Sequence, residues 1–390
     1  MRRRRTRSRG THRDQLRVAI VLKELLHYRV EFFEGLRVRL ATSDIALQLY
    51  VGDPVGADRL RRDSAQISWA TPTRNRVIRF GRRALLWQPV LRQVHTADLV
   101  IVEQASRLLA NYLLLAGAKI GGPKVAFWGH GRNLQNDHSR VGEWVKRRVS
   151  RFPDWWFGYT ESTAAIVRAL GFPPDRITVT NNSIDTQSLT AALRELTDDD
   201  VERCRLKLGV DGGQIGLFLG SLNPEKQIPF LIEACKAVRN KVPDFELVLV
   251  GDGPERSWVE EATRELDWVH LIGARTAEGR VPYVAMSQLL LVPSAVGLVA
   301  LDSIALETPI VATRGGCGPE IEYLVNGVNA CLLAEGTSSA SYARAVVDLL
   351  VDDERREALV EGCRDAQGAV TLEAMVNRFA AGVEAALCAS

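Results

Sequence analysis

The stretch from Leu290 to Thr313 combines residue types that could bind a phosphorylated ligand. Its pattern predicts a buried apolar strand, a short turn, a helix that carries Asp302 in its first two turns, and a second buried strand. The turn comprises residues 295–298, which include Val296, Gly297 and Leu298. Free backbone N–H groups and the helix dipole favour a phosphate at such a turn, and the Asp302 carboxylate could reach sugar hydroxyls. The alternative is that Asp302 only stabilises the dipole of its own helix.

Two earlier segments repeat this order of strand, turn and helix. The apolar run 215–219 precedes Ser221 and Lys226, which place a hydroxyl and an ammonium beside a strand end. The run 247–250 precedes Gly251-Asp252-Gly253-Pro254, in which the glycines permit a close backbone approach and the proline suits the first helical position. Three such segments in sequence predict a ligand-binding edge of a parallel sheet.

The order of these motifs resembles the retaining nucleotide-sugar glycosyltransferases of family 4. The resemblance covers about residues 205–335 and continues more loosely upstream through 159–162 and 179–185. It also includes the runs Pro309-Ile310-Val311-Ala312-Thr313 and Pro319-Glu320-Ile321. It implies an α/β protein of the GT-B class, with two Rossmann-like domains facing a central cleft. It further implies transfer of a sugar from a nucleotide-sugar donor to an acceptor hydroxyl in glycan or polysaccharide assembly, with retained configuration and with no metal or other cofactor.

The resemblance also implies roles for the motif residues. Lys226 would neutralise the departing diphosphate, and Ser221 would add a hydrogen bond. Asp302 would hold the ribose, and the turn 251–253 would lie on the base side. The predicted donor-binding set is Ser221, Lys226, Gly251, Asp252, Gly253, Val296, Gly297, Leu298 and Asp302.

The chain departs from the family pattern at two positions. The family has two glutamates eight positions apart; Asp302 occupies the second position, and the first glutamate is absent from a turn about three residues shorter than usual. Ser221 replaces the arginine that commonly partners the lysine. A subgroup of polysaccharide glycosyltransferases resembles this variant. The departures also leave open a GT-B partner protein that binds a sugar nucleotide without transferring the sugar, or a sugar-nucleotide epimerase.

Candidate residues in the N-terminal half follow two predicted strands. His130 lies between glycines in the run 127–133, where a neutral imidazole could hydrogen-bond a sugar hydroxyl, and it matches the family's histidine. The alternative is a turn histidine with a structural hydrogen bond. Arg132 and Asn133 are further candidates on the acceptor side. Arg29 follows the first strand, where family members have a glycine-rich loop, and could either contact the substrate or be a solvated arginine at a helix start.

The elements expected in the N-terminal half alternate between strands and helices, as a Rossmann-like domain requires. The predicted strands are 16–22, 45–51, 99–102, 124–128, 155–159 and 177–179, and the predicted helices include 32–40 and 106–115. The expected domains are a basic disordered tail at 1–15, an N-terminal acceptor domain at 16–185, a C-terminal nucleotide-sugar-binding domain at 200–370, and a C-terminal helix at 371–390 that could cross back to the N-terminal domain. The acidic runs 198–200 and 352–354 are interpreted as helix starts and not as metal ligands.

Charge is divided unevenly along the chain. Residues 1–180 carry a net charge of +17 and residues 181–390 a net charge of −14. A basic N-terminal half suits peripheral contact with an anionic membrane that presents a sugar or lipid-linked sugar acceptor, although a solubilising surface is the alternative. No nucleic-acid-binding motif accompanies the charge. Without a long apolar segment or a secretory signal, and with six scattered cysteines that lack metal-ligand spacing, we expect a cytoplasmic protein at or near the inner face of the cell membrane.

Overall fold

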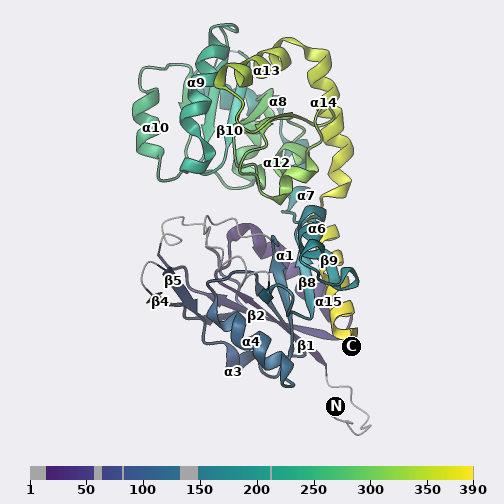
Figure 1. The fold of residues 1–390 in the computed structure, drawn as a ribbon. Helices are drawn as coiled ribbons and strands as arrows, with labels where there is room; N and C mark the ends of the chain where they lie inside the picture. The colour runs from purple at the N-terminus through teal and green to yellow at the C-terminus, as the bar shows by residue number, and fades with distance from the viewer. Residues whose placement is uncertain (1–14, 57–63, 81–82, 132–147, 211–212, 390) are drawn as a thin grey trace. The chain divides into compact units, whose positions relative to one another are not determined.

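The computed structural model describes residues 15–56, 64–80, 83–131, 148–210 and 213–389, which divide into two compact units (Figure 1). Unit 1 comprises residues 1–157, 167–178 and 379–390, and unit 2 comprises residues 158–166 and 179–378. The chain therefore passes from one unit to the other at four places. The expected basic tail lies outside the described residues, apart from residue 15.

Unit 1 is built on a sheet with the strand order β3-β2-β1-β6-β7-β8-β9 among the described residues. The strands are β1 (Leu16–Leu22), β2 (Ile45–Gly52), β3 (Thr71–Thr73), β6 (Leu99–Glu103), β7 (Lys124–Gly129), β8 (Trp155–Gly158) and β9 (Ile177–Val179). The structure confirms all six predicted strands to within one residue. Strand β1 pairs in parallel with both β2 and β6, and its residues Val18, Ala19 and Ile20 are fully buried because both faces of a central parallel strand are covered.

Helices of unit 1 follow the expected apolar periodicity. They are η1 (His27–Arg29), α1 (Val30–Ala41), α3 (Leu91–Val94), α4 (Leu109–Lys119) and η2 (Pro174–Arg176), while α6 (Glu161–Ala169) continues across a boundary between the units. Helix α1 buries Phe32, Phe33, Leu36 and Leu40, one stripe of an amphipathic helix. The predicted helices at 32–40 and 106–115 correspond to α1 and α4.

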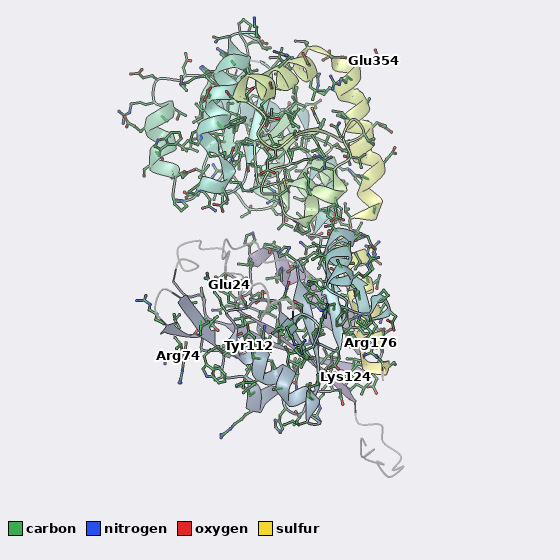
Figure 2. All side chains as sticks on the ribbon, viewed as in Figure 1. Glu24, Arg74, Tyr112, Lys124, Arg176 and Glu354 are labelled. Carbon is green, nitrogen blue, oxygen red and sulfur yellow. The ribbon has the colours of Figure 1, made fainter. Side chains whose placement is uncertain are left out.

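The C-terminal helix α15 (Leu372–Cys388) contributes its residues from Phe379 onward to unit 1. Phe379 stacks on Phe157 with ring centroids 4.3 Å apart and meets Trp128 edge-on at 5.1 Å. Near the end of this helix, the Nζ of Lys124 donates to the carbonyls of Ala386 and Leu387. Figure 2 shows Lys124 close to the C-terminal end of the helix. Aromatic packing and hydrogen bonds from Lys124 therefore hold the end of α15 in unit 1.

The less regular region between residues 53 and 87 contains an antiparallel hairpin, β4 (Arg76–Phe80) and β5 (Arg83–Trp87). Arg76 and Arg79 are exposed on the first strand of the hairpin, and Arg74 is exposed just before it. Figure 2 labels Arg74 beside the hairpin. Val77 and Ile78 are also 45% and 46% exposed. The hairpin therefore presents basic and apolar side chains together.

Unit 2 is built on a second sheet, with the order β12-β11-β10-β13-β14-β15 and parallel pairing throughout the described strands. The strands are β10 (Ile215–Leu219), β11 (Glu246–Val250), β12 (Val269–Leu271), β13 (Leu289–Val292), β14 (Ile310–Thr313) and β15 (Ala330–Leu333). Parallel strands gather their carboxyl ends at one edge, so the turns after β10, β11 and β13 lie along that edge.

The helices of unit 2 alternate with these strands along much of the chain. They are α7 (Thr186–Glu195), α8 (Asp198–Leu208), η3 (Pro224–Lys226), α9 (Ile228–Arg239), α10 (Arg256–Thr263), η4 (Glu278–Arg280), α11 (Val281–Ala285), α12 (Val299–Ala305), η5 (Pro319–Tyr323), α13 (Ser339–Val351), α14 (Asp353–Ala366) and η6 (Gln367–Ala369). Helix α9 packs against α13, and α12 packs against α7 and α14 (Figure 1).

Helix starts in unit 2 test two predictions. The acidic runs are helix starts as predicted, since α8 has a capping box between Thr197 and Asp200 and α14 has Asp352 as its N-cap. The prediction that Pro254 opens a helix is wrong, because α10 begins at Arg256 after a turn. The six cysteines are free thiols.

Candidate functional site

Two turns at the carboxyl edge of the unit 2 sheet pack directly on each other. A Cβ atom on Gly251 would lie 1.8 Å from the carbonyl oxygen of Gly220, and one on Gly253 would lie 2.6 Å from that of Leu222. The Leu222 amide also donates to the carbonyl of Asp252 at 3.0 Å. The structure confirms the close backbone approach that was predicted at these glycines and shows that the approaching group is the backbone of the neighbouring turn. Their role in donor binding stays a prediction.

Lys226 joins the turn after β10 to the turn after β13. It ends η3, is half-buried, and its Nζ donates to the carbonyl oxygen of Ala295. Burial lowers the pKa of Lys226 below its usual value, although the nearby Glu225 and Glu320 oppose that shift. The lysine therefore lies between two turns at strand ends, with its ammonium bound to a main-chain carbonyl.

The Lys226 contact is framed by two non-glycine residues in left-handed backbone conformations. Gln227 has φ of 51° and Ala295 has φ of 52°, a region that costs non-glycine residues roughly 1 kcal/mol or more. Ala295 is held there because its amide donates to Gly315 O at 2.9 Å, and Ser294 Oγ donates to the same carbonyl at 3.1 Å. Hydrogen bonds to Lys226 and to the Gly315 carbonyl therefore fix the backbone of the turn after β13.

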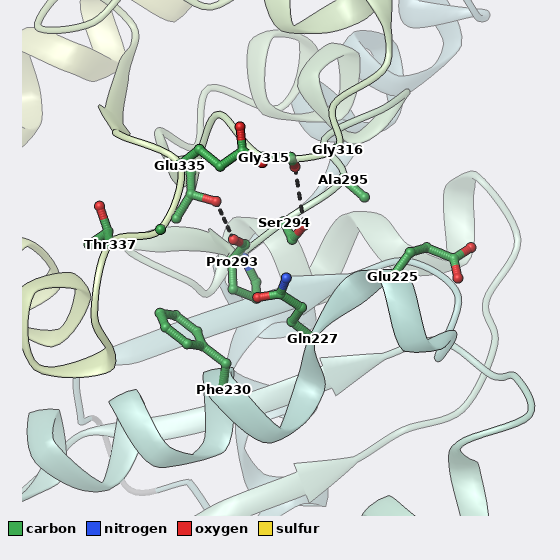
Figure 3. Close-up of a pocket in the computed structure, with 12 residues that line it drawn as sticks. Glu225, Gln227, Phe230, Pro293, Ser294, Ala295, Gly315, Gly316, Glu335 and Thr337 are labelled. Atoms are coloured by element: carbon green, nitrogen blue, oxygen red, sulfur yellow. Dashed lines mark hydrogen bonds between the residues drawn. The ribbon is translucent and has the colours of Figure 1, made fainter. Parts of the chain in front are cut away.

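A pocket of about 370 Å³ opens beside this contact. Figure 3 shows its lining, which comes from the ends of β13, β14 and β15 and from the start of α9. The lining residues are Glu225, Gln227, Phe230, Pro293, Ser294, Ala295, Thr313, Gly315, Gly316, Glu335, Gly336 and Thr337. Two carboxylates, one aromatic ring and several hydroxyl groups therefore surround the pocket, and its lining contains no lysine or arginine.

Asp302 lies in the first turn of α12 and is 4% exposed. Its Oδ1 accepts a hydrogen bond from Arg280 Nη2, an ion pair that the sequence analysis missed. Burial raises the pKa of the Asp302 carboxyl above its usual value, and the Arg280 guanidinium opposes the shift. Arg280 is 22 positions upstream in a separate helical turn, so no local spacing could have indicated it.

The remaining donor-side candidates differ in exposure. Ser221 is exposed and accepts a hydrogen bond from Asn223 Nδ2 at 2.9 Å. Asp252 is exposed, and its Oδ1 accepts from the Gly253 amide at 2.8 Å. Val296 is buried, while Gly297 and Leu298 are half-buried immediately before α12. The sequence candidates of unit 2 therefore come from neighbouring strand ends, as predicted for one sheet edge.

Ser294 immediately precedes the shortened turn from which the first glutamate of the family pattern is absent. Its side chain is 5% exposed and hydrogen-bonds the Gly315 carbonyl at the wall of the pocket. The carboxylates of Glu225 and Glu335 line the same pocket from other segments.

His130 follows β7 in unit 1. Its glycine neighbours are required by local packing, because a Cβ on Gly129 would lie 2.7 Å from Cβ of Gln104, and Gly131, with φ of 67°, donates its amide to Gln104 Oε1 at 2.9 Å. Burial and the nearby positive charge of Arg29 lower the pKa of His130 to about 4. The imidazole is therefore neutral at pH 7, as the predicted hydrogen-bonding role requires.

Arg29 lies close to the same edge of the unit 1 sheet. Its Cζ is 4.5 Å from the centroid of the Trp128 ring, in a cation–π arrangement. Glu103, at the end of β6, accepts a hydrogen bond from the Lys23 amide at 2.5 Å. Burial raises the pKa of Glu103, and the Arg29 charge opposes that rise. Glu103 was missed from the sequence, where it appears only as the last residue of an apolar run.

Two acceptor-side candidates, Arg132 and Asn133, lie outside the described residues. Within the described ranges, no group of three or more His, Cys, Asp and Glu side chains is arranged to hold a metal ion. Over the same ranges, no helix has the length and apolar character needed to cross a membrane.

Comparisons with known families match both halves of the chain. The model described as Glycosyltransferase Family 4 matches residues 20–188, and the one described as Glycosyl transferases group 1 matches residues 213–352. D-inositol 3-phosphate glycosyltransferase of Salinispora tropica is 30% identical over 208 residues, 49% of this chain and 42% of that protein. Alpha-D-kanosaminyltransferase of Streptomyces kanamyceticus is 30% identical over 191 residues, 45% and 44% of the two chains. The matched region thus spans less than half the length of these curated relatives.

The fold is shared with solved structures over nearly the whole chain. The crystal structure of Anabaena Alr3699/HepE in complex with UDP has a TM-score of 0.68 at 17% identity and covers 95% of this chain and 99% of that chain. Both sheets, the order of the motifs from Ser221 to Asp302, and the two family matches point to one assignment. The chain belongs to the family 4 glycosyltransferases and has the two-domain GT-B fold.

Proposed function

We propose that this protein transfers a sugar from a nucleotide-sugar donor to an acceptor hydroxyl in glycan or polysaccharide assembly. The observation that carries the proposal is the position of Lys226, whose ammonium reaches the strained turn after β13 at the edge of a parallel sheet. A diphosphate is the ligand that such an ammonium and such a turn suit. The names of relatives support the same reaction class, since they describe glycosyltransferases, and the matching Anabaena structure contains UDP.

In this proposal, Lys226 exchanges the Ala295 carbonyl for the donor diphosphate and stabilises the charge of the leaving group. Ser221, which is exposed near the same turn, adds a hydrogen bond. Asp302 accepts hydrogen bonds from the ribose, and Arg280 fixes the orientation of its carboxylate. The neutral His130 imidazole accepts or donates a hydrogen bond at the reacting sugar. By resemblance to the family, configuration at the transferred carbon is retained, and the reaction needs no metal or other cofactor.

The pocket beside Lys226 suggests which sugars are transferred. A volume of about 370 Å³ can hold a sugar ring, and Phe230 offers it an apolar face. Glu225 and Glu335 would accept hydrogen bonds from hydroxyl or ammonium groups and would repel a carboxylate. We therefore expect a neutral hexose or an amino sugar as the transferred group and not a uronic acid.

The acceptor side is proposed from unit 1. Its exposed hairpin combines Arg74, Arg76 and Arg79 with Val77 and Ile78, a composition that suits the headgroups and first carbons of an anionic membrane. We propose that the protein contacts the inner face of the cell membrane peripherally from the cytoplasm and finds there a sugar or lipid-linked sugar acceptor. The absence of a nucleic-acid-binding motif leaves the membrane as the preferred anionic partner.

The test is calorimetric titration of UDP, GDP and ADP, and then their sugar conjugates, into wild type, Lys226→Ala and Lys236→Ala. Lys236 is an exposed lysine near the end of α9 and serves as the matched control. We expect one nucleotide to bind the wild type and the control equally, and to bind Lys226→Ala about 10- to 100-fold more weakly, the loss of one charge-assisted hydrogen bond. Unchanged binding to Lys226→Ala would remove Lys226 from the donor site.

A second candidate function is a sugar-nucleotide-binding partner protein without transferase activity. Ser221 in place of the partner arginine, and the absence of the first glutamate from the shortened turn, favour it because both changes remove charged groups from the donor edge. Nucleotide binding with neither transfer nor donor hydrolysis would support this function. Release of free sugar or an epimerised sugar nucleotide without an acceptor would instead support the epimerase.

A further inference from the structure

Two segments of unit 2 begin where the chain enters that unit, and they pair with each other. We call residues 158–162 and 179–183 the crossing segments. The amide of Thr180 donates to Gly158 O at 2.9 Å, and that of Asn182 donates to Tyr159 O at 3.0 Å. Between these two amides, Asn181 has a left-handed φ of 50°, which asparagine tolerates better than most residues. The crossing segments therefore form one hydrogen-bonded unit.

The short helix η5 holds both crossing segments through two carboxylates. Glu322 Oε1 accepts from Thr160 Oγ1 at 2.6 Å, and both of its oxygens lie 3.2 Å from the Ser162 amide. Glu320, which is 5% exposed, accepts from Asn182 Nδ2 at 2.6 Å. Tyr323 adds a hydrogen bond from its hydroxyl to Asn182 O at 2.9 Å. These contacts join runs of sequence about 140 to 160 residues apart.

The same short helix is attached to the turn after β13. The amide of Gly318 donates to Val296 O at 2.7 Å. A Cβ on Gly318 would lie 2.6 Å from Glu320 Oε2 and 3.3 Å from Val296 O, so there is no room for a larger residue at position 318. The Glu320 charge also acts on Lys226, where it raises the pKa against the larger effect of burial. Glu320 therefore hydrogen-bonds a crossing segment and acts electrostatically on the lysine that contacts the turn after β13.

We propose that Glu320 and Glu322 are positioning residues that couple donor binding at the turn 295–298 to the crossing segments. This inference rests on the proposed donor site. A ligand that reduces the motion of the turn also reduces the motion of Gly318 and η5. Through their hydrogen bonds, the two carboxylates then restrict the motion of residues 158–162 and 179–183. Because coupling between two sites is reciprocal, loosening the crossing segments must also loosen the turn.

The reciprocity provides a test that needs no ligand. Amide hydrogen exchange is measured for nucleotide-free wild type, Glu322→Ala, Asn182→Ala and the control Glu265→Ala, an exposed glutamate of the same unit. We expect each of the first two variants to speed exchange about tenfold in the crossing segments and also in the turn 295–298, as the loss of one or two hydrogen bonds predicts. The control should match the wild type. Faster exchange confined to the crossing segments would overturn the coupling.

The exchange measurement is then repeated with the nucleotide that the calorimetry identifies. In wild type, we expect the nucleotide to slow amide exchange in both the turn and the crossing segments. In Glu322→Ala, it should slow exchange in the turn alone. Glu322→Gln, which keeps one acceptor oxygen, should restore most of the protection, an outcome that a folding defect would not give. Equal protection of the crossing segments in wild type and Glu322→Ala would refute the proposal. Failure of every nucleotide to bind would refute the donor site, while the nucleotide-free exchange would still decide the coupling.

Discussion

The polar edges of the two sheets hold their charged groups in different ways. In unit 2, the Lys226 ammonium is bound to a main-chain carbonyl and Asp302 is paired with Arg280 on a framework of tightly packed turns. In unit 1, the charges of Arg29 and Glu103 act on each other, and Arg29 also acts on His130 and lies over an aromatic ring. The first edge holds its charged groups in fixed pairs, whereas at the second edge Arg29, Glu103 and His130 form an electrostatically coupled set that lowers the pKa of His130.

If buried ion pairs stabilise unit 2, removing Arg280 should lower the free energy of unfolding more than any other change considered. Arg280→Met leaves the buried Asp302 carboxylate without its cation, which we expect to cost about 3–5 kcal/mol. The matched control is Arg264→Met, whose ion pair with Glu261 is exposed and should contribute less than about 1 kcal/mol. Urea unfolding monitored in unit 2 measures both changes, and equal losses would contradict the comparison.

The rigid backbone framework of unit 2 predicts the next largest effect. Gly251→Ala places a methyl group 1.8 Å from Gly220 O, a backbone atom that cannot move aside, and should cost about 3 kcal/mol. Gly297→Ala, where no atom lies within 4 Å, should retain nearly wild-type stability. Thermal unfolding of the two variants tests this contrast. A tolerated Gly251→Ala would show that the turns are looser than the packing indicates.

The coupled charges of unit 1 predict a dependence on pH. The folded pKa of His130 is about 4, below the usual value of about 6.5, so the unfolded chain binds more protons between these values. Stability therefore falls as pH decreases from about 6.5 to 4, and this residue should account for about 2 kcal/mol of the loss between pH 8 and pH 5. In His130→Gln, the loss of stability between pH 8 and pH 5 should be smaller by that amount, which urea unfolding at the two pH values would measure. An unchanged pH slope would place His130 outside the coupled set.

The arginine-rich hairpin of unit 1 predicts the smallest effect per residue. Each of Arg74→Gln, Arg76→Gln and Arg79→Gln should weaken binding to vesicles that contain anionic lipid by about fivefold, corresponding to about 1 kcal/mol per charge near a membrane surface. Sedimentation with neutral and anionic vesicles at two salt concentrations measures this, with Arg264→Gln in unit 2 as the control. Binding that ignores both lipid charge and salt would argue against electrostatic docking.

Local sequence patterns predicted most of the framework. Six strands of unit 1 and the strand ends that carry Ser221, Lys226 and Asp302 were predicted because buried parallel strands require short apolar runs with turn residues between them. The sequence predicted that the glycines at 251 and 253 permit a close backbone approach, but only the structure identifies the approaching group as the backbone of the neighbouring turn. His130 was identified from its flanking glycines, but the neutral state of its imidazole depends on burial and on Arg29.

The sequence by itself determined the two Rossmann-like halves, the order of the strand ends and the family, because these depend on periodicity and on motifs within short windows. Only the tertiary structure assigned the partners: Arg280 to Asp302, the Ala295 carbonyl to Lys226, Arg29 to Glu103, and the two glutamates of η5 to the crossing segments. Such pairs join residues 22 to 162 positions apart, and no local pattern encodes them. They arise because folding brings distant strand ends to one edge, where burial makes each polar group require a partner.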